Sequence, residues 1–130
     1  MDIVPEVAAE ARRRSIDLGL ADRVEVRPLD ARDLPERNTF RAAYWAQCFF
    51  PDSSRAGTLA VLRQALTKDG LLILQEQPAT SIDAVQQAQR GISAGHSAEE
   101  LAREAEEAGF VLVRQVATAL GNLTLMRNQP

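Results

Sequence analysis

The chain has 130 residues, of which 45% are apolar and 25% charged, and its formal net charge is −3. This length and composition are typical of one soluble globular domain. Acids and bases are interleaved without a strong basic tract, and no apolar run approaches the ~18 residues of a membrane span, so the sequence argues against a nucleic-acid binder and against a membrane protein.

Cysteine and histidine usage narrows the chemistry further. The single cysteine, Cys48, excludes an internal disulfide framework and fits a reducing, cytoplasmic compartment. With only one histidine, His96, an all-protein zinc site is not expected, and we predict no metal. Met1 is followed by Asp2 without a basic and then apolar leader, so we expect no secretory signal.

The first predicted element is the end of a strand, Asp2-Ile3-Val4, followed by a helix that begins near Pro5. Gly19, followed by Leu20, is a typical helix stop with a hydrophobic contact after it. The residues expected on the buried helix face share helical spacing. They are Val4, Val7, Ala8, Ala11, Ser15 and Leu18.

The next element is a predicted strand, Val24–Leu29, which ends on Asp30. A carboxylate at the carboxyl end of a strand in an alternating α/β chain lies where open parallel sheets bind ligands. It can accept hydrogen bonds from an amino or hydroxyl group of a bound nucleotide. The alternative is that Asp30 and Asp33 form only the polar turn after the strand.

The middle of the chain predicts strand, helix and strand. The first half of Phe40–Phe50 favours a strand, and 51–54 offers N-cap hydroxyls to a helix with a core face. In the turn Lys68–Gly70 we expect glycine to carry a positive φ, and Leu71–Leu74 reads as a strand covered on both faces. The helix core face is Leu59, Leu62, Ala65 and Leu66.

The C-terminal third predicts helices and a hairpin. A helix is expected from about Ile82 to Gln89, and Ser97–Glu100 has the spacing of a capping box. Leu101, Ala105 and Ala108 form the stripe expected to be buried, and Gly109 is expected to end that helix. The apolar runs 110–113 and 123–126 predict an antiparallel hairpin at a sheet edge. The whole order indicates an α/β fold with a parallel sheet and crossovers.

With these elements in place, the chain resembles a class I S-adenosylmethionine-dependent methyltransferase over nearly its whole length. The stretches that carry the resemblance are Asp2–Glu6, Gly19–Val24, Leu29–Ala31, Trp45–Gln47, Leu62–Ile73 and the closing helix and hairpin. The resemblance implies a single domain, 1–130, with a Rossmann-like, mostly parallel sheet, helices on both faces and an antiparallel C-terminal edge hairpin. It also implies N-terminal truncation, because the family's first strand and glycine-rich turn would precede Asp2.

The resemblance assigns roles to six residues. Asp2, with Ile3 beside it, is similar to the acid that binds the cofactor's ribose hydroxyls, the alternative being a terminal acid. Asp30 is similar to the acid that receives the adenine amino group, with the Ala31 amide near the ring. Ala46 and Gln47 match the loop beside the methyl-bearing sulfur, the alternative for Gln47 being a loop residue without a binding role.

The same resemblance predicts an incomplete sheet. The strands near 40–46, 71–74, 123–126 and 110–113 would remain contiguous in that order, but Val24–Leu29 would lose its neighbour and leave an edge. We expect the chain to be unstable alone, or repaired by a register change, by pairing of Val24–Leu29 with Ala42–Ala46, or by another copy or partner chain.

The expected function is methyl transfer from S-adenosyl-L-methionine to a small-molecule acceptor, with no catalytic residue assigned. Phe49-Phe50-Pro51 departs from the signature of the family's amino-group methylators of nucleic acids and glutamine. A surface role is favoured for His96, and a packing role for Cys48. For Trp45, Phe49 and Phe50, a position in the protein core is favoured over an acceptor pocket. The alternatives are a non-catalytic methyltransferase-like module that binds a partner chain, and a fragment of another nucleotide-binding enzyme such as a dehydrogenase.

Overall fold

The computed structural model describes residues 5–46, 52–76, 97–119 and 121–129. The chain divides into two compact units, Met1–Pro35 and Glu36–Pro130, which we call the N-terminal unit and the C-terminal unit. The single-domain assignment of 1–130 stays a prediction. The predicted strand end Asp2–Val4 and the predicted helix Ile82–Gln89 lie outside the described residues.

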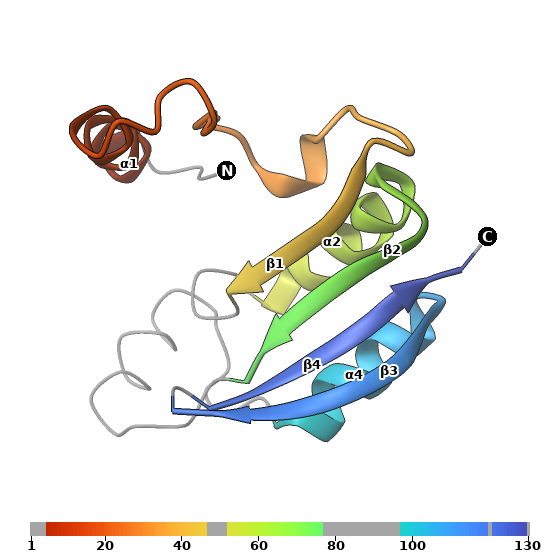
Figure 1. Cartoon of the computed structure of the whole chain (residues 1–130). Helices are drawn as coiled ribbons and strands as arrows, with labels where there is room; N and C mark the ends of the chain where they lie inside the picture. Colours follow the sequence, from red (N-terminus) through yellow and green to blue (C-terminus); the bar gives the residue numbers. More distant parts are fainter. Residues whose placement is uncertain (1–4, 47–51, 77–96, 120, 130) are drawn as a thin grey trace. The chain divides into compact units, whose positions relative to one another are not determined.

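The N-terminal unit begins with helix α1, Pro5–Asp17 (Figure 1). The helix stops as predicted at Gly19, which has a φ of 70° and whose amide donates to the Ile16 carbonyl at 3.0 Å. The Leu20 amide donates to the Ser15 carbonyl at 2.8 Å. These two bonds form a Schellman motif, which needs a residue that tolerates positive φ, and glycine does so without steric cost.

The predicted buried face of α1 is only partly buried. Ala8 is 2% exposed, and Ala11 and Ser15 are half-buried. Val7 and Leu18, in contrast, are 47% and 72% exposed. Helical spacing therefore identified the helix correctly, but the apolar stripe was predicted too wide.

The strand predicted at Val24–Leu29 is not formed. The segment has no β-ladder, and Arg12 Nη2 donates to the Val26 carbonyl at 3.1 Å. A strand needs a neighbour to satisfy its backbone groups, and Pro28 has no N–H to contribute. The prediction of a strand at Val24–Leu29 was therefore wrong.

The C-terminal unit is built on a four-stranded sheet in the order β1, β2, β4, β3 (Figure 1). The strands are β1 (Phe40–Ala46), β2 (Leu66–Gln75), β3 (Phe110–Thr118) and β4 (Gly121–Asn128). β1 and β2 are parallel, whereas β4 is antiparallel to both β2 and β3. The α/β class, the order of these strands and the C-terminal hairpin are confirmed.

Helices α2 (Asp52–Ala65) and α4 (Ala98–Glu107) pack on one face of this sheet (Figure 1). On that face Leu72 and Leu74 of β2 are 0% and 1% exposed, while Leu71 and Ile73 on the opposite face are half-buried. The expectation that Leu71–Leu74 is covered on both faces is therefore confirmed for one face, while the other face is partly covered. The other core residues are Trp45, Leu59, Leu62, Leu66, Leu101, Ala102, Ala105, Phe110 and Met126.

Two local predictions around α2 need correction. The helix already includes Asp52, so Ser53 and Ser54 lie in its first turn rather than before it. At the other end Leu66 is buried as predicted, but it is the first residue of β2. The boundaries shift by one or two residues while the buried face stays the same.

The turn within β2 places its positive φ on Asp69, at 64°, and not on Gly70 as predicted. Aspartate is among the non-glycine residues that tolerate the left-handed region best. Gly70 has a packing role instead, because a Cβ there would lie 2.9 Å from the Thr67 carbonyl oxygen.

Helix α4 begins at the predicted cap, where Ser97 Oγ accepts from the Glu100 amide at 3.2 Å. Leu101 and Ala105 are 0% exposed and Ala108 packs against the same core, so the predicted stripe is confirmed. A polar cap followed by this spacing gives a sequence signal that needs no tertiary information.

The end of α4 is joined to α2 by Arg63. Its Nη1 donates to the Ala108 carbonyl at 3.1 Å and its Nη2 to the Gln129 carbonyl at 2.8 Å. Asn128 Nδ2 donates in turn to the Arg63 carbonyl at 3.1 Å. Gly109, at φ 105°, leaves room for this arginine, because a Cβ would lie 1.5 Å from Arg63 Nη1.

Candidate functional site

The six residues predicted to bind a cofactor are distributed over both units. Asp2, Ile3 and Gln47 lie outside the described residues. Asp30 and Ala31 lie next to each other in the N-terminal unit, and Ala46 ends β1 with its backbone opposite Gln75. Asp30 and Ala31 can therefore be described as one site within the N-terminal unit. Ala46, in the C-terminal unit, is described by itself.

Asp30 caps a short 3-10 helix, η1 (Ala31–Asp33). Its backbone is extended, with φ −66° and ψ 131°, and its Oδ1 accepts from the Arg32 amide at 2.9 Å. The Arg32 guanidinium also reaches the carboxylate, with Nη2 2.7 Å from Oδ2 and Nε 3.1 Å from Oδ1. The polar-turn role of Asp30 is thus confirmed, and the turn holds the carboxylate in a defined orientation.

The charge of this carboxylate is stabilised by the same contacts. The Arg32 guanidinium, and next the Arg32 amide, hold the pKa of the Asp30 carboxyl below its usual range. The pair correspondingly raises the pKa of Arg32. Asp30 is therefore ionised at neutral pH, and an ionised carboxylate is a pure hydrogen-bond acceptor.

Ala31 supplies a backbone donor beside this acceptor. Its carbonyl accepts from the Leu34 amide at 3.3 Å, while none of the hydrogen bonds recorded for the described residues uses its own amide. The first amides of a helical turn have no intrahelical acceptor, which explains the difference. An acceptor and a donor on adjacent residues match a ligand edge that carries one donor and one acceptor.

Sequence reasoning did not single out a second polar group, at the carboxyl ends of β1 and β2. The Tyr44 hydroxyl donates to Gln75 Oε1, and the Tyr44 side chain is 58% exposed. Glu76 Oε2 accepts from the Asn122 amide at 3.0 Å, and the Glu76 amide donates to the Asn122 carbonyl at 2.8 Å. Ligands usually bind at the carboxyl ends of the parallel strands in α/β sheets. In the sequence, Gln75 and Glu76 directly follow the apolar run Leu71–Leu74, and this position could have indicated the polar group.

Comparison with solved structures identifies the fold. The chain aligns over 95% of its length with the mitomycin 7-O-methyltransferase MmcR, at 24% identity and a TM-score of 0.74. It aligns over 95% with PigF bound to SAH, at 19% identity and a TM-score of 0.69. The fold is that of class I methyltransferases.

The methyltransferase fold alone does not fix the reaction. The [4+2]-cyclase SpnF matches equally well, with 18% identity over 98% of this chain and a TM-score of 0.72. The chain spans 40%, 41% and 65% of the lengths of MmcR, PigF and SpnF. No protein-family model matches the sequence, and no curated protein does.

Within the methyltransferase fold Trp45 belongs to the core and not to an acceptor pocket. Its side chain is 3% exposed, and the Arg55 guanidinium carbon lies 5.0 Å from the centre of its ring. Arg55 also forms a bidentate ion pair with Glu104 of α4, with Nε 2.7 Å from Oε1. The core interpretation of Trp45 is confirmed, and Cys48, Phe49, Phe50 and His96 lie outside the described residues.

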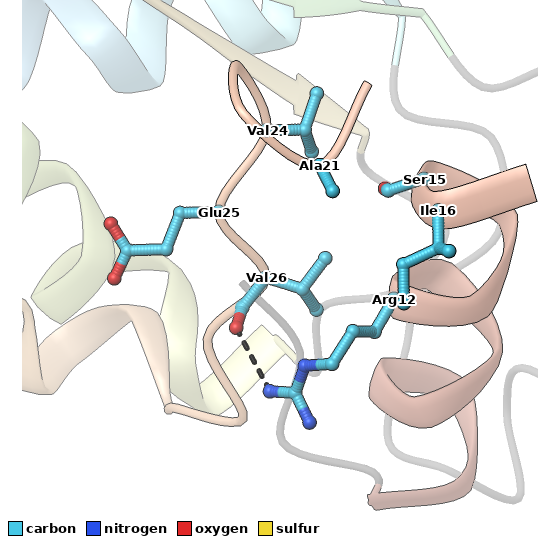
Figure 2. A pocket seen from close by; sticks show the side chains of 7 residues that line it. All are labelled: Arg12, Ser15, Ile16, Ala21, Val24, Glu25 and Val26. Atoms are coloured by element: carbon cyan, nitrogen blue, oxygen red, sulfur yellow. Dashed lines mark hydrogen bonds between the residues drawn. The ribbon is translucent and has the colours of Figure 1, made fainter. Parts of the chain in front are cut away.

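A shallow pocket of about 290 Å³ lies between α1 and the following segment (Figure 2). It is lined by Arg12, Ser15, Ile16, Ala21, Val24, Glu25 and Val26. The Arg12 guanidinium lies along one side and donates to the Val26 carbonyl (Figure 2). The pocket does not include Asp30 or Ala31, and we interpret it as incomplete packing where the predicted strand is not formed.

Two negative findings apply to the described part of the chain. No group of three or more histidine, cysteine, aspartate or glutamate side chains there is placed to hold a metal ion. In the same residues, every helix is too short or too polar to cross a bilayer.

Proposed function

We propose that this chain is part of an S-adenosylmethionine-dependent methyltransferase, and that it binds the adenine end of the cofactor through Asp30 and Ala31. The turn at Asp30 is the observation that carries the proposal. It combines an ionised acceptor, fixed by the Arg32 amide, with the neighbouring Ala31 amide. The methyltransferase fold supports the assignment.

The residues present fit an adenine ring edge. Adenine carries an amino donor next to a ring-nitrogen acceptor, which pairs with a carboxylate and a backbone amide respectively. Asp30 is 24% exposed, so its carboxylate is accessible to a ligand. The small side chain of Ala31 places little bulk beside the ring. We propose that Asp2 and Ile3 contact the ribose, and Ala46 and Gln47 the region of the sulfur.

When bound, the cofactor supplies the reactive methyl group, and this chain would contribute position rather than covalent chemistry. Two observations support a small-molecule acceptor. The fold neighbour MmcR is a mitomycin 7-O-methyltransferase, and basic residues in this sequence are interleaved with acidic ones rather than clustered as in nucleic-acid binders. The single cysteine supports a cytoplasmic location.

The proposal is tested by calorimetric titration of the chain with S-adenosylhomocysteine. We expect Asp30→Ala to weaken binding by about 1–3 kcal/mol, since a ligand donor loses its partner. Asp33→Ala is the matched control, because it removes an exposed carboxylate from the same turn. Equal loss in both variants, or binding that ignores Asp30, would contradict the assigned role.

A second candidate function is a non-catalytic module that binds a partner chain. The observation that favours it is the position of β1 at one edge of the described sheet, where a further strand could add. Such a module would bind no S-adenosylhomocysteine and would form a dimer or a complex. Light scattering of the purified chain with and without the ligand separates the two functions.

A further inference from the structure

The Asp30 carboxylate is already covered by a side chain of its own turn. Arg32 Nη2 lies 2.7 Å from Oδ2, and Arg32 Nε lies 3.1 Å from Oδ1 and 3.3 Å from Oδ2. Both oxygens therefore have a guanidinium donor. An arginine fork matches a carboxylate in this two-point geometry better than any other side chain does.

The two oxygens are not equivalent. Oδ1 also accepts from the Arg32 backbone amide at 2.9 Å, a bond that belongs to the fold of the turn. Among the residues that the structure describes, Oδ2 accepts from guanidinium donors alone, and the Arg32 side chain that supplies them is 48% exposed. A ligand amino group therefore has one natural target, Oδ2, and must share it with the guanidinium or displace it.

We propose that Arg32 is a competing residue that covers the ligand-facing oxygen of Asp30 and is displaced when an adenine amino group binds. This inference rests on the proposed function and deepens it, because it concerns the access of the ligand to that site. Displacement is easy, since exposed ion pairs contribute little and are weakened by salt. The arginine thus lowers the affinity of the turn for adenine without blocking it.

The competition also affects selectivity between purines. The Asp30 carboxylate alone accepts from a 6-amino group and repels a 6-oxo group. The Arg32 guanidinium carries donors that a 6-oxo group can accept from. With Arg32 present the 6-oxo oxygen has a donor, although the N1–H of that ring still faces the Ala31 amide. Without Arg32 both positions of the 6-oxo edge are mismatched, and only the amino edge fits.

The test is calorimetric titration with 5′-methylthioadenosine, an uncharged probe, and with its 6-oxo analogue 5′-methylthioinosine. We expect Arg32→Ala to bind the amino probe about two- to fivefold more tightly than the unmodified chain. It should bind the 6-oxo probe no better. Arg23→Ala is the matched control, because it removes an exposed arginine of the same unit and should change neither affinity.

The dependence of the amino-probe affinity on ionic strength is a second measurement. A merely structural role of Arg32 would not produce the salt dependence expected here. Raising salt should increase the affinity of the unmodified chain for the amino probe towards that of Arg32→Ala, and should leave the variant unchanged. Equal or weaker binding by Arg32→Ala would overturn the inference while the adenine site stands. Failure of every variant to bind either probe or S-adenosylhomocysteine would overturn the proposed function and this inference together.

Discussion

The two units differ in what holds them together. In the C-terminal unit two helices cover one face of the sheet, and Leu66, Leu72 and Leu101 are completely buried. In the described part of the N-terminal unit the buried apolar side chains are Ala8 and Ala31. Burial of large apolar side chains is the main source of folding free energy, so the C-terminal unit has a core of its own and the N-terminal unit has very little.

The polar contacts show the same difference. Arg13 and Arg14 pair with Glu10 within one helix, and Arg32 pairs with Asp30 across two positions. Such local, exposed pairs contribute little to stability, because solvent screens the charges. In the C-terminal unit the part-buried ion pair links α2 to α4. The unit that carries the proposed adenine contact is therefore held mainly by short-range bonds.

The largest expected effect comes from the core of the C-terminal unit. Leu101 is 0% exposed, and Leu101→Ala should lower the free energy of unfolding by about 2–5 kcal/mol. The matched change in the N-terminal unit, Ile16→Ala, removes a side chain that is 61% exposed and should cost less than about 0.5 kcal/mol. Urea denaturation measures both, and similar losses would break the comparison.

The two helix-ending glycines sharpen the comparison. Gly109 has φ 105°, and a Cβ there would displace the Arg63 guanidinium from the Ala108 and Gln129 carbonyls. Gly109→Ala should therefore cost the backbone strain together with these hydrogen bonds, about 2 kcal/mol or more. Gly19 has φ 70° with nothing near the added Cβ, so Gly19→Ala should cost only the backbone strain of about 1 kcal/mol. A smaller loss at Gly109 than at Gly19 in thermal unfolding would contradict this account.

The ion pairs should follow the same order. Glu104→Gln removes the charge from a pair whose arginine side chain is only 6% exposed, and should cost about 1–2 kcal/mol. Glu10→Gln acts on exposed partners and should change the stability much less. Added salt should weaken the Glu10 pairs more than the Glu104 pair. Equal costs in denaturant titrations would show that burial does not distinguish the two units' ion pairs.

The smallest effect is the dependence of the Asp30 turn on pH. Contact with Arg32 lowers the pKa of the Asp30 carboxyl in the folded state. The stabilisation is therefore present above the unfolded pKa of ~3.9 and is lost as the pH falls through the lower, folded pKa. Carboxyl-carbon NMR should show a titration midpoint below ~3.9 that moves upward in Arg32→Ala. A midpoint at or above ~3.9 in the unmodified chain would contradict the pairing.

Features decided within a few residues were the most predictable from sequence. The Ser97 cap and the helix stops at Gly19 and Gly109 follow from side-chain chemistry and backbone sterics at one position. The alternation of predicted strands and helices indicated the α/β class. The order β1, β2, β4, β3 within the sheet was also predicted, but from the resemblance to the methyltransferase family and not from the apolar runs.

Features that depend on distant partners were not predictable. Val24–Leu29 has the composition of a strand, but a strand forms only against a neighbour, and local sequence does not show whether one is present. The pairing of Tyr44 with Gln75 required the β1–β2 register. Arg32, two residues after Asp30, is close enough in sequence to contact the Asp30 carboxylate. The sequence did not show in which direction the Arg32 side chain points.

The most direct test of the central claim is a residue-resolved amide NMR titration of the chain with S-adenosylhomocysteine. The account predicts that the Ala31 amide shifts with the dissociation constant that calorimetry gives, and that Asp30→Ala weakens this response. Shifts confined to other residues, with Ala31 unmoved at saturating ligand, would contradict the assignment of the Asp30–Ala31 turn as the adenine site.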